Sequence, residues 1–245
     1  MSGENTNTFN KHNIDYCLNE LAKEYKKLTG RKIGAEIILI GGAAIIENYG
    51  FREMTTDVDA IITAESAMKD AINRVGDRLN LPNGWMNNDF QKTESYSSKI
   101  FQYSTFYKTF NQVLNVRVIT GEYLIAMKLR AFRQYKNDLS DIIGILFEHN
   151  KKGDKISFEQ INKAVIDLYG SWEGFPKGAK DYIEEALSSE NYEQAYVRVR
   201  QNEKSTKNDL VGFEENYPGT LKTDNIDAVL QSLRAKKRNT DDRQR

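Results

Sequence analysis

Residues 37–62 read IILIGGAAIIENYGFREMTTDVDAII. The unbroken apolar run at 37–40 is typical of a buried strand, and it stops at Gly41 and Gly42. A short apolar helix follows, and a second apolar strand then begins near Asp57. Two buried strands joined by a short helix are typical of a sheet covered by helices, so this stretch predicts an α/β core.

The two glycines form a candidate phosphate-binding turn. A strand that ends in Gly41 and Gly42 and continues into a helix leaves backbone N–H groups free at the helix N-terminus. No side chain blocks the approach of a phosphate there. Strand-Gly-Gly-helix turns also occur for purely steric reasons, so the turn alone leaves both interpretations open.

The second motif is Asp57-Val58-Asp59, a candidate metal site. Residues two apart on a strand share a face, so both carboxylates project together about 6–7 Å apart at their roots. Two such carboxylates repel each other unless a cation lies between them. Mg²⁺ is the expected cation, because it prefers hard oxygen ligands and completes its shell with water and substrate phosphates. The alternative is that both acids lie at a solvated strand end.

Taken together, residues 39–61 resemble the signature of the nucleotidyltransferase superfamily, which has the DNA polymerase beta-like fold. That signature is a Gly-Gly or Gly-Ser turn followed by Asp-x-Asp. The resemblance implies Mg²⁺ as the cofactor and an NTP as the substrate. It assigns the triphosphate to the backbone N–H groups of Gly41 and Gly42, and the metal to Asp57 and Asp59.

Three residues just before the acidic pair are candidate nucleotide ligands: Arg52, Thr55 and Thr56. Their side chains carry hydrogen-bonding groups suited to phosphates or ribose. The alternative is a loop that merely starts the strand, and this alternative is favoured for Thr55. Arg52 and Thr56 are therefore the nucleotide-binding candidates.

A second resemblance covers residues 122–131, EYLIAMKLRA, and 138–141, DLSD. The block is similar to one found in AbiEii- and MenA-type toxin nucleotidyltransferases and their uncharacterised relatives. In that branch a lysine at the position of Lys128 and an aspartate of the Asp-x-x-Asp segment are implicated in activity. The resemblance therefore adds Lys128 and Asp141 as catalytic candidates, with Asp138 interpreted as a helix cap.

Chemistry supports these roles, although structural alternatives exist. A lysine in the cleft would neutralise triphosphate charge, and a further carboxylate would orient that lysine or relay a proton. Alternatively, Lys128 extends from an amphipathic helix to solvent. Asp141 would then be a first-turn acid that stabilises the start of the next helix.

One departure from the superfamily pattern concerns a third metal-binding carboxylate, which many members place on a later strand. The matching strand here, at 113–118, offers Asn115 and Arg117, and neither side chain is an anionic ligand. Two-metal catalysis is therefore not predicted, and a single Mg²⁺ that arrives with the nucleotide is the expected arrangement.

The predicted fold class is α/β (α+β), with a small mixed sheet of four to five strands flanked by helices and followed by a helical C-terminal region. The predicted organisation is a nucleotidyltransferase-type core over 1–120, a helical domain packed on it over 121–204, and a polar tail with one helix over 205–245. Beyond the opening stretch, the patterns predict helices over 14–28, 64–79, 123–135, 139–148, 158–169, 180–187, 192–202 and 224–236, a loop over 81–98, and strands over 100–106 and 113–119.

Composition narrows the class of protein further. Lys+Arg and Asp+Glu number 35 each, so the surface as a whole is not an electrostatic trap for nucleic acid. Cys17 is the only cysteine, which excludes an intrachain disulfide and a cysteine metal cluster. No signal-like start and no run of eighteen apolar residues is present, so we expect a cytoplasmic protein without a membrane span.

The predicted function is a Mg²⁺-dependent nucleotidyltransferase that transfers a nucleoside monophosphate from an NTP to an acceptor and releases pyrophosphate. Three classes of acceptor are expected: an RNA such as tRNA, a protein, or a small molecule. The resemblance to toxin-type enzymes implies a toxin–antitoxin or phage-defence component with an antitoxin as partner. The alternative is a catalytically silent relative that binds a nucleotide or a partner protein, and the missing third carboxylate supports it.

Overall fold

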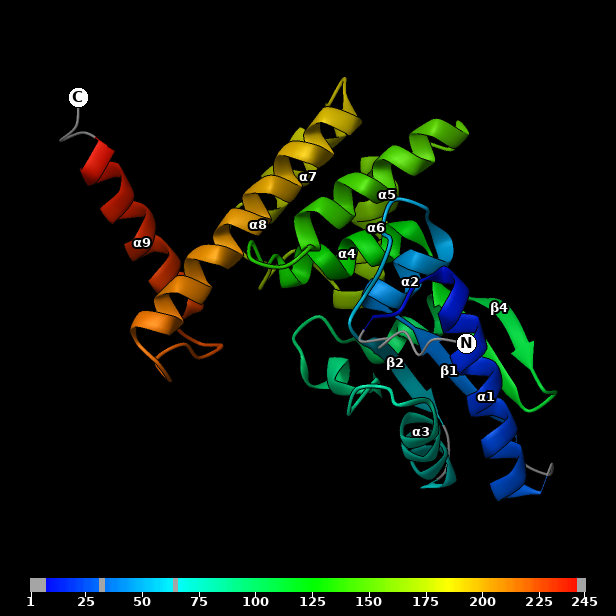
Figure 1. The fold of residues 1–245 in the computed structure, drawn as a ribbon. Coiled ribbons are helices and arrows are strands. Elements are labelled where there is room, and N and C mark those ends of the chain that lie inside the picture. Colours follow the sequence, from blue (N-terminus) through cyan, green and yellow to red (C-terminus); the bar gives the residue numbers. More distant parts are fainter. Residues whose placement is uncertain (1–7, 31–33, 64–65, 242–245) are drawn as a thin grey trace.

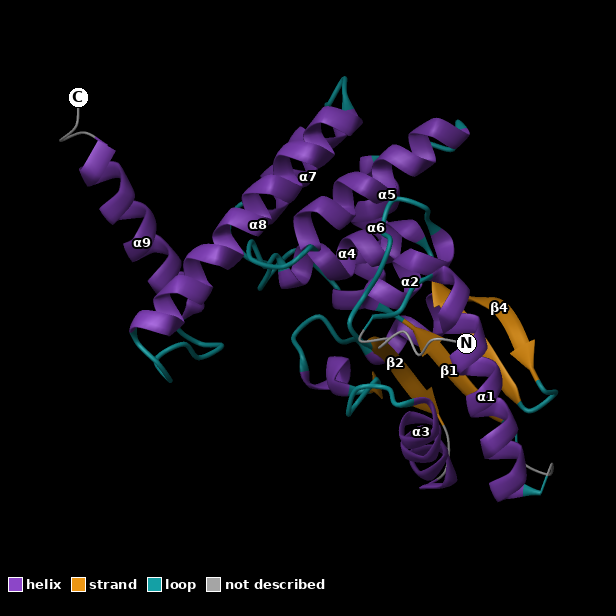
Figure 2. Cartoon of the chain, in the orientation of Figure 1, coloured by secondary structure: helices purple, strands orange, loops and turns teal. Residues whose placement is uncertain are grey.

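The computed structural model describes residues 8–30, 34–63 and 66–241, with the backbone alone over 237–241. The predicted fold class is confirmed: a five-stranded mixed sheet is flanked by helices and followed by a helical C-terminal region (Figures 1 and 2). The strands are β1 (Ala35–Leu39), β2 (Val58–Thr63), β3 (Met86–Asn87), β4 (Ser104–Phe110) and β5 (Leu114–Ile119).

The sheet has the strand order β3-β2-β1-β5-β4. Its central strand β1 runs antiparallel to β2 and parallel to β5. Ile37, Ile38 and Leu39 are all buried, which means that both faces of β1 are covered. The unbroken apolar run in the sequence is therefore explained by a strand with no solvent-facing side.

The helices form two groups (Figure 1). α1 and α3 pack against each other beside the sheet, whereas α4 packs against α5, α6 and α7. The α-helices are α1 (Lys11–Thr29), α2 (Gly41–Asn48), α3 (Ser66–Leu79), α4 (Gly121–Ala131), α5 (Asp138–Lys152), α6 (Phe158–Tyr169), α7 (Ala179–Leu187), α8 (Tyr192–Asn216) and α9 (Ile226–Asp241).

Local sequence fixes several helix ends. α1 begins at a capping box in which the Asn10 side chain accepts from the backbone N–H of Asn13, and Asn13 accepts from that of Asn10. It ends at Gly30, whose φ of 65° is the left-handed conformation common after helices. α6 begins at a similar box formed by Ser157 and Gln160. These short-range bonds explain why the bounds of α1 and α6 lie close to the predicted ones.

Two predictions for the middle of the chain need correction, one in the type of structure and one in its bounds. The predicted loop over 81–98 contains β3, which pairs with β2, and a 3-10 helix at Asp89–Lys92. The strand predicted over 100–106 begins later, as β4 at Ser104, because a 3-10 helix occupies Ser98–Tyr103. The hydroxyl of Ser97 accepts the backbone N–H of Lys99, and this local bond favours a turn over an extended strand.

The helices near the C-terminus also differ from the predicted ones. α4 ends at Ala131, because Phe132 has a left-handed φ of 46°. α8 does not stop near residue 202 but continues as one helix to Asn216. Its later turns bury Leu210, and Leu230 is buried on α9, which packs against α8. Contact between two amphipathic helices therefore sustains a segment whose polar composition resembled a tail.

Figure 1 shows α8 as a long helix that runs along α5 and ends at α9, away from the sheet. α3 covers the described part of the helix predicted over 64–79; Ala64 and Glu65 lie outside the described residues. No helix in the described part of the chain is long and apolar enough to cross a membrane.

Gly144 on α5 provides a test of this packing. A Cβ added there would overlap the ring of Phe51, so we expect Gly144→Ala to lower the free energy of unfolding by about 1–3 kcal/mol. Gly212→Ala on α8 is the control, because its Cβ would meet no neighbour and alanine favours the helix by about 1 kcal/mol. Urea unfolding of both variants measures the difference. Equal stabilisation by both substitutions would contradict the packing described here.

Candidate functional site

Gly41 and Asp59 face each other at the start of α2. Gly41 is separated from β1 by one residue, Ile40, and has a left-handed φ of 56°. A Cβ at this position would lie 2.9 Å from Oδ2 of Asp59. Only glycine therefore combines this backbone conformation with so close an approach of the carboxylate. The structure brings together the first glycine and the second acid of the two sequence motifs.

Gly42 faces two other side chains of the same stretch. A Cβ there would lie 2.6 Å from Oγ1 of Thr55 and 2.7 Å from a terminal guanidinium nitrogen of Arg52. The N-cap residue of α2, Ile40, provides no side-chain capping bond. A guanidinium group thus lies beside a helix N-terminus without a side-chain cap, which is an arrangement suited to a phosphate.

The two threonines before the acidic pair lie in different surroundings. Thr55, interpreted as the start of a strand, does pair its backbone with Phe9, yet its hydroxyl also faces Gly42. Thr56, the predicted ligand, is exposed, and its hydroxyl lies 3.5 Å from Oδ1 of Asp57. The sequence pattern Thr-Thr gives no indication of which hydroxyl points to the glycine turn.

The acidic pair lies at the beginning of β2. Asp57 directly precedes the strand and Asp59 is its second residue. Burial and then the charge of Asp57 raise the pKa of Asp59, whereas Lys128, Lys136 and Arg133 act in the opposite direction. The two carboxylates are therefore close enough to repel each other. A hard divalent cation such as Mg²⁺ fits this oxygen-only donor pair, because it removes the repulsion.

A third carboxylate does not complete this pair. In the strand register Arg117 pairs with Ile38, and Ile38 pairs with Ile61, which lies on the same sheet face as Asp59. Arg117 donates from Nε to Oγ of Ser104 at 2.7 Å. Within the residues that the structure describes, no group of three or more His, Cys, Asp or Glu side chains is arranged to hold a metal ion. On the sheet face of Asp59, β5 therefore offers the cation Arg117 and no acidic side chain.

Lys128 lies in the interior, between two carboxylates of α5. Its Nζ is 2.9 Å from Oδ1 of Asp138 and 2.8 Å from Oδ2 of Asp141, and its side chain is only 11% exposed. Burial lowers the pKa of Lys128, but the charges of Asp138 and Asp141 outweigh it, so the pKa is raised. The alternative in which this lysine extends to solvent is therefore wrong, and its buried ammonium group is stabilised by two paired acids.

Asp138 is not the helix cap that its spacing suggested. The N-cap of α5 is Asn137, and Asp138 is the first helical residue, fully buried. Its Oδ2 accepts from Nε of Arg133 at 2.7 Å, in addition to the bond from Lys128. These two cations lower the pKa of Asp138 despite its burial, which acts to raise it. Arg133 belongs to this group although the sequence patterns did not indicate a role for it.

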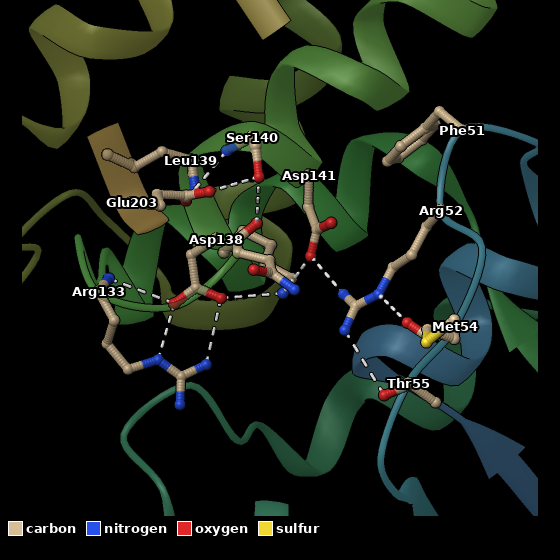
Figure 3. Close-up of polar contacts among 12 residues, drawn as sticks. Phe51, Arg52, Met54, Thr55, Arg133, Asp138, Leu139, Ser140, Asp141 and Glu203 are labelled. Atoms are coloured by element: carbon tan, nitrogen blue, oxygen red, sulfur yellow. Dashed lines mark hydrogen bonds and ion pairs between the residues drawn. The ribbon is translucent and has the colours of Figure 1, made fainter. Parts of the chain in front are cut away.

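Arg52 connects these buried charges to the glycine turn, as Figure 3 shows. One guanidinium nitrogen donates to Oδ2 of Asp141 at 2.8 Å, and the other lies 3.5 Å from Oγ1 of Thr55. We call the set Arg52, Lys128, Arg133, Asp138 and Asp141 the α5 ion cluster. Its three cations and two carboxylates leave one positive charge in excess, and Arg52 carries positive charge toward Gly42.

A mixed sheet whose central strand ends in a glycine turn, with an Asp-x-Asp strand and an arginine facing that turn, defines a protein of the nucleotidyltransferase class. A comparison with family models agrees. Residues 17–174 match the family described as "Nucleotidyltransferase of unknown function (DUF6036)", and the chain belongs to this family. Comparison with curated proteins and with solved structures gave no match.

The family match confirms the superfamily predicted from the sequence. It does not extend to the AbiEii- and MenA-type toxins, so that nearer resemblance stays a prediction from the block around Lys128. The matched residues include the glycine turn, the acidic pair and the whole α5 ion cluster.

Removal of the buried lysine tests the α5 ion cluster. We expect Lys128→Met to lower the free energy of unfolding by about 3–5 kcal/mol, because Asp138 and Asp141 lose their shared counter-ion. Lys92→Met is the control: its pair with Asp89 is exposed, so solvent screening leaves it with little effect. Chemical denaturation measures both. A Lys128→Met variant as stable as the control would show that the buried pairing does not stabilise the fold.

The acidic pair makes a prediction about pH. Because burial and Asp57 raise the pKa of Asp59, its carboxyl group should titrate above the ordinary range of an aspartate. A raised pKa means that the folded state favours the protonated carboxyl group of Asp59. Its contribution to the free energy of unfolding is therefore present at low pH and is lost as the pH rises through the folded-state pKa. Carboxyl ¹³C NMR in the absence of metal measures the midpoint. Asp57→Asn should move the midpoint down, and a midpoint that does not move would show that the acids do not interact.

Proposed function

We propose that this protein transfers a nucleoside monophosphate from an NTP to an acceptor and releases pyrophosphate. The observation that carries the proposal is the double contact at the glycine turn: the Asp59 carboxylate lies against Gly41, and the Arg52 guanidinium lies against Gly42. One contact suits a metal and the other suits a phosphate. A metal–nucleotide complex requires both at adjacent positions.

In this proposal Asp57 and Asp59 hold Mg²⁺, which when bound supplies positive charge that polarises the phosphates. The backbone N–H groups of Gly41 and Gly42 bind the triphosphate at the start of α2. Arg52 adds a charged donor beside them, and planar guanidinium groups bind phosphate oxygens well.

The transfer step is a displacement at the α-phosphorus of the NTP. An oxygen of the acceptor forms a bond to the α-phosphorus, and the bond from that phosphorus to the oxygen bridging to the β-phosphorus breaks. Pyrophosphate leaves with the electron pair, and the proton of the acceptor passes to water. Negative charge grows on the leaving group, and the fixed positive groups near the turn stabilise it.

In this proposal Lys128 and Asp141 act on the site from buried positions, without contacting the nucleotide. Lys128 contributes its positive field toward Asp59 without leaving its two acids. Asp141 orients Arg52 through the bond at 2.8 Å. The lysine predicted from the sequence to neutralise the triphosphate would thus act together with Arg52, while Thr56 would contact the nucleotide from the exposed side of Asp57.

The acceptor in this proposal is an RNA such as tRNA, a protein or a small molecule, and the experiment below distinguishes them. The resemblance to toxin-type enzymes favours RNA and a cytoplasmic toxin–antitoxin or phage-defence role with an antitoxin as partner. The equal numbers of acidic and basic residues, 35 each, give RNA no additional support.

A second candidate function rests on Arg117. On the sheet face of Asp59, β5 carries Arg117 and no acidic side chain, whereas many superfamily members place a metal-binding carboxylate on a later strand. This observation favours a silent relative that binds a nucleotide, or a partner through it, without turnover. Binding together with transfer separates the two candidates.

The decisive test uses the purified chain with each labelled NTP, Mg²⁺ and either total RNA or cell lysate. We expect the double variant Asp57→Ala, Asp59→Ala to lower label transfer by roughly 100-fold or more, the effect of removing a main charge-stabilising group. Isothermal titration should show the loss of Mg²⁺-dependent NTP binding in the same variant. The control is Asp70→Ala, Asp77→Ala, which removes two exposed acids of α3.

The outcomes separate the proposals clearly. Transfer of label to RNA, protein or a small molecule names the acceptor class. Binding without transfer to any acceptor supports the silent relative and overturns the enzyme. Absence of Mg²⁺-dependent binding in the unmodified protein overturns both.

A further inference from the structure

The start of α5 lacks a cap from its own residues. A helix N-terminus leaves its first backbone N–H groups without partners, and the side chain of the N-cap residue normally accepts from one of them. The side chain of Asn137 makes no such bond and accepts instead from Arg200 of α8. The carboxylate of Asp138 is turned to Lys128 and Arg133. Neither residue therefore caps the helix that carries the α5 ion cluster.

A glutamate from a distant helix caps it instead. Oε1 of Glu203 on α8 accepts from the backbone N–H of Leu139 at 2.9 Å and of Ser140 at 3.1 Å. Oε2 accepts from the Ser140 hydroxyl at 2.5 Å. Glu203 is only 3% exposed, and Figure 3 shows it beside the first turn of α5. A buried carboxylate that accepts three bonds at a helix start is a strong cap.

The first turn of α5 makes two sets of contacts. Its backbone is held by Glu203, while its side chains Asp138 and Asp141 hold Lys128 and Arg52. The orientation of the turn therefore sets where the guanidinium of Arg52 lies. We infer that Glu203 is a positioning residue of the candidate site: by capping α5 it fixes Asp141, and through Asp141 it holds Arg52 beside Gly42.

This inference rests on the proposed function, and it deepens it. Glu203 lies outside residues 17–174, the part that matches the family model. The C-terminal helix α8 would thus be a working part of the nucleotide site rather than an appendage. The same assignment explains why a charged residue is buried between α5 and α8, where an apolar residue would pack without the cost of desolvation.

Three variants at pH 8 test the inference. Burial raises the pKa of Glu203 to about 7, although its three donors act to lower it, so pH 8 keeps the carboxylate ionised. Glu203→Ala removes every bond to the turn. Glu203→Gln keeps an acceptor oxygen for the two backbone N–H groups, and Glu193→Ala removes an exposed glutamate of the same helix as the matched control.

The first measurement is Mg²⁺-dependent ATP binding by titration calorimetry, at a temperature where circular dichroism shows each variant folded. We expect Glu203→Ala to weaken binding about tenfold, the size of one lost helix cap, and Glu203→Gln to recover most of it. Glu193→Ala should bind as the unmodified protein does. A folded Glu203→Ala variant with unchanged affinity would overturn the inference.

The second measurement does not depend on nucleotide binding. The ammonium group of Lys128 is buried and paired, so its ¹⁵N signal should be visible by NMR and absent from Lys128→Met. The inference predicts that Glu203→Ala shifts or broadens this signal, whereas Glu193→Ala leaves it unchanged. An unchanged signal in Glu203→Ala would overturn the inference.

The two measurements separate this inference from the proposed function. If the unmodified protein binds no nucleotide, the proposed function fails, and the Lys128 signal still decides whether Glu203 positions the cluster. If Glu203→Ala does not fold, Glu203→Asp replaces it, because the shorter carboxylate keeps the charge but does not reach both the backbone and Ser140. An unchanged Lys128 signal and unchanged ATP affinity in that variant would again overturn the inference.

Discussion

The buried charge of Lys128 is the constraint on which the rest of the site depends. An ammonium group in a protein interior is stable only when acids surround it, and here Asp138 and Asp141 do so at 2.9 and 2.8 Å. Because the lysine belongs to α4 and both acids to α5, the pairing fixes the angle between these helices. Arg52 then carries the same network out of the helical region to the glycine turn at the end of β1.

The candidate site therefore lies where two structurally different halves meet. The sheet contributes the glycine turn and the acidic pair, whose geometry follows from strand alternation and from the conformational freedom of Gly41. The helices contribute fixed positive charge with its own counter-ions. Such fixed charge stabilises charge that develops during a reaction better than mobile side chains or water do, because it is already oriented.

The sheet thus provides acidic side chains and the helices provide excess positive charge, in a chain that belongs to the family of nucleotidyltransferases of unknown function. A site with two acids and a nearby excess of positive charge favours binding of a polyanion together with one divalent cation. Arg117, on the sheet face of Asp59, adds a further positive charge. In the proposed function, the nucleotide's own phosphates would therefore supply part of the metal's ligands.

Features that depend on short-range interactions can be predicted from the sequence. The apolar run, the Gly41-Gly42 turn and the spacing of Asp57 and Asp59 act within a few residues, so local pattern predicts them. The remaining features depend on long-range packing. Arg52 meets Asp141 89 residues later, and Ser140 meets Glu203 63 residues later. No local pattern encodes such pairs: many charged side chains compete for each partner in a sequence, and only the packing of α4, α5 and α8 selects the partners that a buried charge requires.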